Sequence, residues 1–448
     1  AAGNAAAAAA SAGATVWVTG TTCAAGVVRD SPTNVQTYRD TAGGLSSTDP
    51  ASDTTGRWIS AMLPSAEAIG LPNLPPTAVF NFASGVIDRR FVELRSTAGT
   101  RYNIFGNLET LAAGVAKPTF NPLTRACEGY LASPAATYMG IDSEDFAGWG
   151  ASDTGGGFGA AVAAPDGTLT AKSWTVPTST VQFGFGQKIK YGGIDASGQA
   201  VFEVWVRRPA GSGVIALGIS DISAVSNAGA NEAVGTTWRK LSFTSTTLTN
   251  TGDSGAGFTV TPGGVFELWH PTLVLGTNAN QPYYPTTSSS FPRDADRLAL
   301  DLTAHTAVIN PNGFTLVIAL DGTTVPNSGV ALMLTGVGTD EIYLIRIGAN
   351  WTCYGKASGV LDVQTSVGAF VAGPTVIALS FSTAGCLGLV RGGSVVSLGT
   401  FAVMPVMESL IVGAYESSGY ELNSHVKLIA TFPRACTAGE LTALVNNI

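Results

Sequence analysis

Histidine often serves catalysis and metal binding near neutral pH, and this chain has only three. His270, His305 and His425 fall outside the HExxH pattern, and no spacing places two of them on one helix face. A nucleophilic triad is not indicated either, because the chain has no GxSxG motif. The sequence therefore predicts structural histidines and a protein that is not an enzyme.

Paired carboxylates could hydrolyse a glycosidic bond, and the chain has 31 acidic residues. Glu144-Asp145 and Asp340-Glu341 are candidates, but the two carboxylates of each pair are adjacent in the sequence. Neighbouring residues of a strand point to opposite faces, so adjacent carboxylates make poor catalytic dyads. A glycan depolymerase remains open as an alternative function.

Metal binding is weakly indicated. The five cysteines are scattered and show no CxxC spacing, so neither a zinc site nor a disulfide framework is predicted: Cys23, Cys127, Cys353, Cys386 and Cys436. Calcium in the C-terminal part stays open, although no Asp-rich loop indicates it. No cofactor is predicted.

Sugar binding needs only a flat aromatic ring that stacks on a pyranose and a few amide or carboxylate groups for its hydroxyls. The chain has both, although each ring could equally belong to a core. The aromatic candidates are Trp17, Tyr38, Trp58, Trp149, Trp174, Trp205, Trp269, Trp351 and Tyr354.

The composition favours strands and tight turns. Charged residues make up 12% of the chain, about half the usual share, while apolar residues reach 45% and glycine numbers 55. A net charge of -8 with only 23 basic residues argues against nucleic-acid binding. No run of 18 apolar residues occurs, so membrane insertion is not predicted.

At 448 residues, the chain is expected to form about three domains. Residues 1–14 are nearly all alanine and predict a short helical stalk, with a flexible linker as the alternative. A small β module is expected over 15–60, and a proline-rich linker over 61–77. Two antiparallel β-sandwich domains should follow over 78–296 and 297–448, the first with a jelly-roll core at about 170–290.

Strand-like runs recur along the last two domains. In Val201 to Val206 and in Val265 to Trp269, alternation puts Phe and Trp on opposite faces, so one is expected to be buried and the other exposed. The single helix is expected at the C-terminus, where Thr437 would be the N-cap and Glu440 would complete a capping box. The other strand runs are Val181 to Ile189, Val214 to Ile219, Thr237 to Phe243, Phe314 to Leu320, Val330 to Leu334, Glu341 to Ile347, Thr375 to Phe381, Gly388 to Val390, Ser409 to Val412 and Val426 to Thr431.

Three stretches resemble modules of bacteriophage tail-fibre and head-spike proteins. The pattern Trp17, Ala25-Gly26-Val27-Val28, Tyr38 and Trp58 resembles the small chitin-binding type of carbohydrate-binding module. That resemblance implies that Trp17, Tyr38 and Trp58 bind sugar, with Tyr38 and Trp58 near the sugar face. The part from Arg297 to Ile448 is similar to concanavalin-like or laminin-G-like sandwiches.

The middle part resembles the phage spike-fibre carbohydrate-binding domain, and the likeness covers about half of the chain. The residues that carry it are Phe80-Asn81-Phe82-Ala83, Arg95-Ser96-Thr97-Ala98-Gly99-Thr100, Asn121-Pro122-Leu123-Thr124, Pro134-Ala135-Ala136-Thr137, Ser143-Glu144-Asp145-Phe146, Ala164-Pro165-Asp166-Gly167, Trp238-Arg239, Leu268-Trp269-His270-Pro271, Tyr284-Pro285-Thr286-Thr287 and Arg293-Asp294-Ala295-Asp296.

Together these resemblances imply a phage virion fibre or spike subunit that binds bacterial surface polysaccharide. The expected partners are two further copies in a homotrimer and other virion proteins. The expected location is the virion surface, after assembly in the host cytoplasm. A structural decoration or spacer protein is the second alternative, beside the depolymerase.

Overall fold

The computed structural model describes residues 15–23, 28–30, 37–40, 44–49, 52, 58–60, 71, 73–139, 143–144, 157–176, 183–190, 199–221, 226–245, 253–260, 263–276, 281–286, 290–415 and 420–448. The predicted stalk, 1–14, and most of the predicted linker, 61–77, lie outside these residues. The prediction of a mainly β protein is confirmed, since strands dominate the described part and its one α-helix is short. None of the helices described could cross a membrane.

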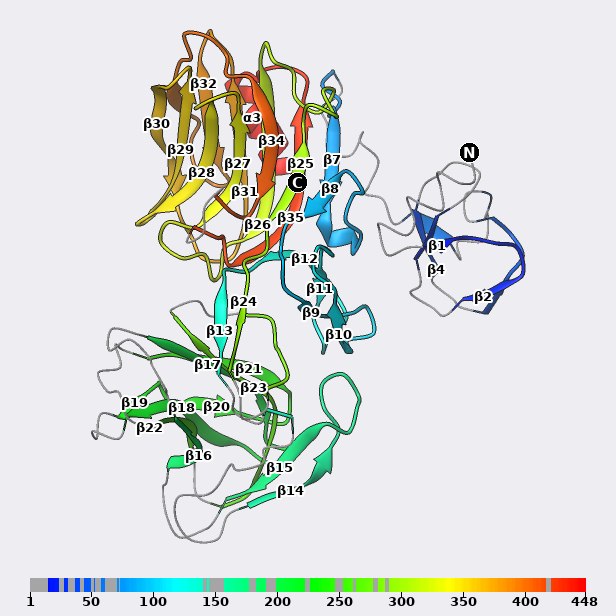
Figure 1. Ribbon diagram of the computed structural model, residues 1–448, viewed down its shortest axis with the longest axis vertical. Helices are drawn as coiled ribbons and strands as arrows, with labels where there is room; N and C mark the ends of the chain where they lie inside the picture. Colours follow the sequence, from blue (N-terminus) through cyan, green and yellow to red (C-terminus); the bar gives the residue numbers. More distant parts are fainter. Residues whose placement is uncertain are drawn as a thin grey trace.

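The N-terminal module is small and lies to one side of the other domains (Figure 1). Its strands form one sheet of four, in the order β1-β3-β4-β6, and one of two. They are β1 (Thr15–Val16), β2 (Thr21–Cys23), β3 (Val28–Asp30), β4 (Thr37–Asp40), β5 (Gly44–Ser46) and β6 (Trp58–Ser60).

The C-terminal sandwich is built from two layers of one hydrogen-bonded set of 15 strands. Alternate residues of both layers meet in one large core, which contains Phe314 and Ile377 from one layer and Leu344 and Trp351 from the other. The strands of the C-terminal part are β25 (Leu298–Asp301), β26 (Phe314–Asp321), β27 (Val330–Gly336), β28 (Glu341–Ile347), β29 (Asn350–Ala357), β30 (Val360–Ala369), β31 (Pro374–Phe381), β32 (Cys386–Val390), β33 (Val396–Gly399), β34 (Met407–Val412) and β35 (Ser424–Phe432).

Helix α3 (Ala438–Asn447) covers the outer face of the layer that contains β31 and β35 (Figure 1). Leu441, Leu444 and Val445 pack on this face. The predicted capping box is confirmed: the Glu440 N–H donates to Thr437 Oγ1, and the Thr437 N–H donates to Glu440 Oε2. Hydrogen bonds from Arg434 and from Thr437 lower the pKa of Glu440 to about 2.

Replacing Thr437 by Ala should lower the free energy of unfolding by about 1 kcal/mol, because the helix loses the side chain that caps its first turn. Thermal or denaturant unfolding followed by circular dichroism measures this loss. Thr442→Ala is the matched control, since that hydroxyl lies on the exposed side of the same helix and bonds the Ala438 carbonyl. An equal loss in both variants would contradict the capping role.

The predicted boundary between 296 and 297 does not match the strand pairing. Strands from before residue 133 are hydrogen-bonded into the C-terminal sandwich, where β7 and β12 both pair with β35 and β8 pairs with β25. The sandwich therefore requires chain from both sides of the jelly roll. These elements are β7 (Ala78–Asn81), the 3-10 helix η2 (Phe82–Ser84), β8 (Phe91–Glu93), β11 (Pro118–Phe120) and β12 (Cys127–Ala132), with the separate hairpin β9 (Gly99–Tyr102) and β10 (Leu108–Leu111) between them.

The residues from Ala136 to Arg293 form a second sandwich, drawn below the first in Figure 1. Its sheets of seven and five strands enclose a core that includes Phe202, Leu217, Phe258 and Phe266. The strands are β13 (Ala136–Tyr138), β14 (Gly157–Val162), β15 (Ala171–Thr175), β16 (Phe183–Lys190), β17 (Ala200–Arg207), β18 (Gly213–Asp221), β19 (Ser226–Ala228), β20 (Glu232–Val234), β21 (Arg239–Thr244), β22 (Asp253–Val260), β23 (Val265–Leu275) and β24 (Phe291–Arg293).

The jelly roll is inserted into the sandwich through two adjacent strands. The entry strand β13 pairs antiparallel with the exit strand β24, with Ala136 opposite Arg293 and Tyr138 opposite Phe291. Both ends of the insertion therefore lie side by side at the junction between the domains (Figure 1).

Phe and Trp do face opposite sides of the seven-stranded sheet, as predicted. Phe202 and Phe266 lie in the core, while Trp205 and Trp269 lie on the other face. Trp205 is half-buried, but Trp269 is fully buried, because Tyr102 of the β9–β10 hairpin packs against it. The expectation of an exposed Trp therefore fails for Trp269.

Candidate functional site

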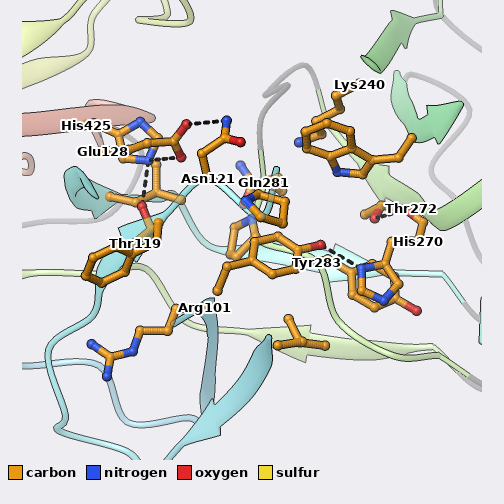
Figure 2. A pocket seen from close by; sticks show the side chains of 17 residues that line it. Arg101, Thr119, Asn121, Glu128, Lys240, His270, Thr272, Gln281, Tyr283 and His425 are labelled. Atoms are coloured by element: carbon orange, nitrogen blue, oxygen red, sulfur yellow. Dashed lines mark hydrogen bonds and ion pairs between the residues drawn. The ribbon is translucent and has the colours of Figure 1, made fainter. Parts of the chain in front are cut away.

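A cavity of about 170 Å³ lies at the junction of the two sandwiches. Its walls come from the β9–β10 hairpin, the β11–β12 segment, the outer face of the jelly roll, the loop at 281–283 and strand β35 (Figure 2). The lining residues are Arg101, Tyr102, Leu108, Thr119, Phe120, Asn121, Pro122, Glu128, Leu131, Trp205, Lys240, His270, Thr272, Gln281, Pro282, Tyr283 and His425.

His270 forms the jelly-roll side of this cavity. Its φ of 49° is uncommon for a residue other than glycine, and such strained positions concentrate at functional sites. The imidazole lies nearly parallel to the rings of Trp269 and Tyr283, with centroid distances of 3.6 and 3.7 Å. Its Nδ1 is 2.6 Å from the Tyr102 hydroxyl.

Burial determines the protonation of His270 and of its partner Tyr102. It lowers the pKa of His270 well below its ordinary value and raises the pKa of Tyr102 well above its own. The imidazole is therefore neutral near pH 7, the phenol keeps its proton, and the Tyr102 hydroxyl and Nδ1 share one hydrogen bond. The other ring nitrogen, Nε2, is 3.8 Å from Glu144 Oε1, which also accepts a hydrogen bond from Tyr283.

His425 forms the opposite side of the cavity, on β35 of the C-terminal sandwich. Its Nε2 is 2.9 Å from Thr119 Oγ1 and 3.7 Å from Glu128 Oε2. Asn121 Nδ2 donates to Glu128 Oε1 at 3.2 Å (Figure 2). Burial lowers the pKa of His425 as well, so neither histidine carries a charge near neutral pH.

Gln281 lies between the two sides, and 3% of it is exposed. Its Nε2 donates to Asn423 Oδ1 at 3.0 Å, whereas its Oε1 is buried and has no hydrogen-bond partner among the described residues. Most buried polar atoms in native proteins are paired, and an unpaired one costs about 1–3 kcal/mol.

The two neutral histidines predict a pH-dependent stability. The pKa values of both histidines are lower in the folded state than in the unfolded state. Their contribution to the free energy of unfolding is therefore fully present above the unfolded pKa of about 6.5, and it is lost as pH falls toward the folded pKa. The free energy of unfolding should therefore fall by up to about 1.4 kcal/mol per pH unit for each histidine below pH about 6.5. Denaturant titrations between pH 8 and pH 5 measure the slope.

The control for this slope uses substitutions that remove one titrating group. His270→Asn should flatten the pH dependence, and Asn tolerates the positive φ at this position. His305→Asn should leave it unchanged, because His305 lies outside the cavity and is only partly buried. Identical slopes for the wild type and His270→Asn would contradict the assignment.

The cavity combines groups that suit a small, hydroxyl-rich ligand. The half-buried Trp205 offers ring surface, while Gln281, Asn121 and Glu128 offer amide and carboxylate groups. Among the described residues, Glu128 is the only carboxylate that lines the cavity, and no three His, Cys, Asp or Glu side chains gather as a metal site would require.

The sugar-binding residues predicted in the small module are not part of this cavity. Trp17 is 7% exposed and donates its indole N–H to Ser46 Oγ at 3.0 Å, so little of its ring is free to stack. Tyr38 and Trp58 lie on neighbouring strands, where Tyr38 is opposite Ser60 and Trp58 is opposite Asp40. Their side chains lie outside the described part, so their predicted role stays a prediction.

Several motif residues of the middle part form a buried ion network instead of a ligand site. Asp296 Oδ1 accepts from Arg95 Nη1 at 2.8 Å, and Oδ2 lies 2.8 Å from Lys117 Nζ and contacts Arg293 Nη2. The side chains of Arg95, Lys117 and Asp296 are fully buried. The three cations hold the pKa of Asp296 well below its usual range, although burial opposes this.

Glu93 completes this network from strand β8. Its carboxylate accepts from the Tyr130 hydroxyl at 3.0 Å and from the Arg297 N–H at 3.0 Å. Burial, with repulsion from Asp296, raises the pKa of Glu93. The network therefore joins the strands before the jelly roll to the segment that leaves it.

Other motif residues do line the cavity, namely Asn121, Pro122 and His270. The lining residue Tyr283 directly precedes the Tyr284 motif. Sequence reasoning assigned the histidines a structural role and missed this site, because its walls come from segments more than 300 residues apart. One signal for this site was present in the sequence. The motifs Asn121-Pro122 and Trp269-His270-Pro271 combine polar and aromatic residues, and both belong to the resemblance that covers the middle part of the chain.

Searches of family models and of curated proteins found no match. Among solved structures, domain 4 of AbnA, an arabinanase from Geobacillus stearothermophilus in complex with arabinotriose, is 12% identical, with a TM-score of 0.28 over 34% of this chain and 73% of that one. The CBM40 of Ruminococcus gnavus IT-sialidase, bound to α2,3-sialyllactose, is 14% identical, with a TM-score of 0.29 over 33% and 91%. Trypanosoma rangeli sialidase in complex with 2,3-difluorosialic acid is 14% identical, with a TM-score of 0.27 over 34% and 26%.

This chain thus spans about a quarter of the sialidase's own length. At such identities and TM-scores, the ligands of these proteins do not transfer to this chain. The function has to be argued from its own residues.

Proposed function

We propose that this chain is a glycan-binding protein and that the cavity between its sandwiches is the binding site. The observation that carries the proposal is a cavity lined by the half-buried ring of Trp205 and by the Glu128 carboxylate, which is 38% exposed. Sugar hydroxyls would donate to this carboxylate while the sugar ring packs on Trp205.

Binding without cleavage fits this geometry better than hydrolysis. Glycoside hydrolysis generally uses two carboxylates that flank the scissile bond, and the lining includes one, Glu128. Glu144 lies outside the lining and accepts a hydrogen bond from the Tyr283 hydroxyl, and Glu109 and Glu203 are paired with Arg101 and Lys240. The proposed function is therefore binding and not catalysis.

The sequence resemblances support a finer proposal: a fibre or spike subunit on the surface of a phage virion, with bacterial surface polysaccharide as its partner. Each site of a trimer would bind the polysaccharide weakly. The three sites together would bind it firmly, because binding at one site raises the effective concentration of polysaccharide at the other two. Light scattering of the purified full chain tests the trimer, and a monomer would overturn it.

A retention assay on immobilised bacterial envelope polysaccharide tests the binding function. The wild type should be retained without releasing reducing ends, and Trp205→Ala should weaken retention about tenfold, since the ring loses its stacking contact. Tyr420→Ala is the matched control, an exposed aromatic outside the lining. Release of reducing ends would favour the depolymerase, and absence of retention would favour a structural spacer.

Trp58→Ala separates the two candidate sites. Retention that is lost in Trp58→Ala but unchanged in Trp205→Ala would move the site to the small module. The opposite pattern would support the cavity.

A further inference from the structure

The charge balance of the cavity limits the class of sugar that it can accept. Each cation of the lining already has a carboxylate partner: Arg101 pairs with Glu109, and Lys240 Nζ lies 3.1 Å from Glu203 Oε2. Glu128 adds a carboxylate whose partners are the neutral groups Asn121 and His425.

Neither histidine offsets this negative charge, because burial keeps both rings neutral. Glu144 adds another carboxylate, whose Oε1 lies 3.8 Å from His270 Nε2. An anionic ligand would therefore meet no free cation among the described lining residues, and it would approach Glu128 without compensation.

The hydrogen-bonding groups favour hydroxyls. The Glu128 carboxylate is an acceptor, and it is 38% exposed. An ionised carboxylate on the ligand has no proton to donate to it, whereas a hydroxyl group can donate one.

The size of the cavity indicates how much of a glycan enters. A cavity of about 150 Å³ holds one benzene molecule, so about 170 Å³ suits a single six-membered ring. Walls contributed by both sandwiches border this space, which fits the end of a chain better than an internal unit with links on both sides.

We infer that the cavity recognises the terminal, uncharged residue of a glycan through its free hydroxyl groups, and that it discriminates against sugars that carry a carboxylate. This inference rests on the proposed glycan-binding function. It specifies the ligand class of that same site.

The test compares matched glycans that differ only in the terminal residue, a neutral hexose or the corresponding uronic acid, by isothermal titration calorimetry with the full chain. The neutral glycan should bind at least tenfold more tightly. Chemical reduction of the uronic acid to the alcohol should restore binding, and a cyclic oligosaccharide without a chain end should not bind.

Glu128→Gln supplies the residue-level check, since it removes the charge and keeps one acceptor oxygen. It should narrow the preference for the neutral glycan by several fold, whereas Glu232→Gln, on the exposed side of the jelly roll, should leave the ratio unchanged. Tighter binding of the uronic acid that is sensitive to Trp205→Ala would overturn this inference but keep the proposed function. No binding of any glycan, or binding insensitive to Trp205→Ala, would overturn both.

Discussion

Replacing Asp296 by Asn should lower the free energy of unfolding by about 3–5 kcal/mol, the usual cost of removing one partner from a buried ion network. Arg95, Lys117 and Arg293 would then remain buried without their shared carboxylate. Denaturant unfolding of the full chain, followed by tryptophan fluorescence, measures this loss.

Two comparisons isolate the buried charge as the cause. Glu232→Gln breaks the surface ion pair with Arg239. The side chains of Arg239 and Glu232 are 44% and 45% exposed, so the loss in the free energy of unfolding should stay below about 1 kcal/mol. Adding Lys117→Met to Asp296→Asn should recover part of the lost stability, because one unpaired cation disappears. A loss of similar size in Glu232→Gln and Asp296→Asn would contradict the role of burial.

Trp269→Ala should cost about 3–5 kcal/mol, as expected for truncating a large, fully buried aromatic side chain. The indole stacks on His270, contacts Tyr102 and Trp205, and donates its N–H to Thr170 Oγ1 at 2.9 Å. The β9–β10 hairpin would lose the contact between Tyr102 and this indole. Differential scanning calorimetry should show the jelly-roll transition at lower temperature.

Leu169→Ala is the control for this substitution, because Leu169 is 71% exposed and lies next to the same contact. Its effect should stay within about 0.5 kcal/mol. A small effect of Trp269→Ala would show that the hairpin and the jelly roll do not depend on each other.

Local signals predicted the fold well. The capping box of α3 needs only residues three apart, and the strands with alternating large apolar residues, such as β17 and β26, follow their predicted runs. Strands β29 and β30 were not predicted, because their outer faces carry small and polar residues that resemble turns.

Nonlocal pairing explains most of what the sequence could not predict. Nothing near Phe80 indicates that its strand pairs with Ile429, and nothing near Asp296 identifies Lys117 as a partner. The cavity could not be predicted for the same reason, since its walls come from distant parts of the chain. The chemical character of its residues can be seen in the sequence, but their meeting depends on how two sandwiches are joined.

The insertion of the jelly roll also sets an order for folding during synthesis. Strand β7 leaves the ribosome some 350 residues before β35, its hydrogen-bonded neighbour, so the sandwich cannot close until the chain is nearly complete. The jelly roll is synthesised before β35 and can fold earlier. Its paired end strands β13 and β24 then place the strands that precede the jelly roll next to the sandwich strands that follow it as the latter leave the ribosome. A truncated chain that ends before β35 should therefore contain a folded jelly roll beside exposed strand edges, which aggregate readily.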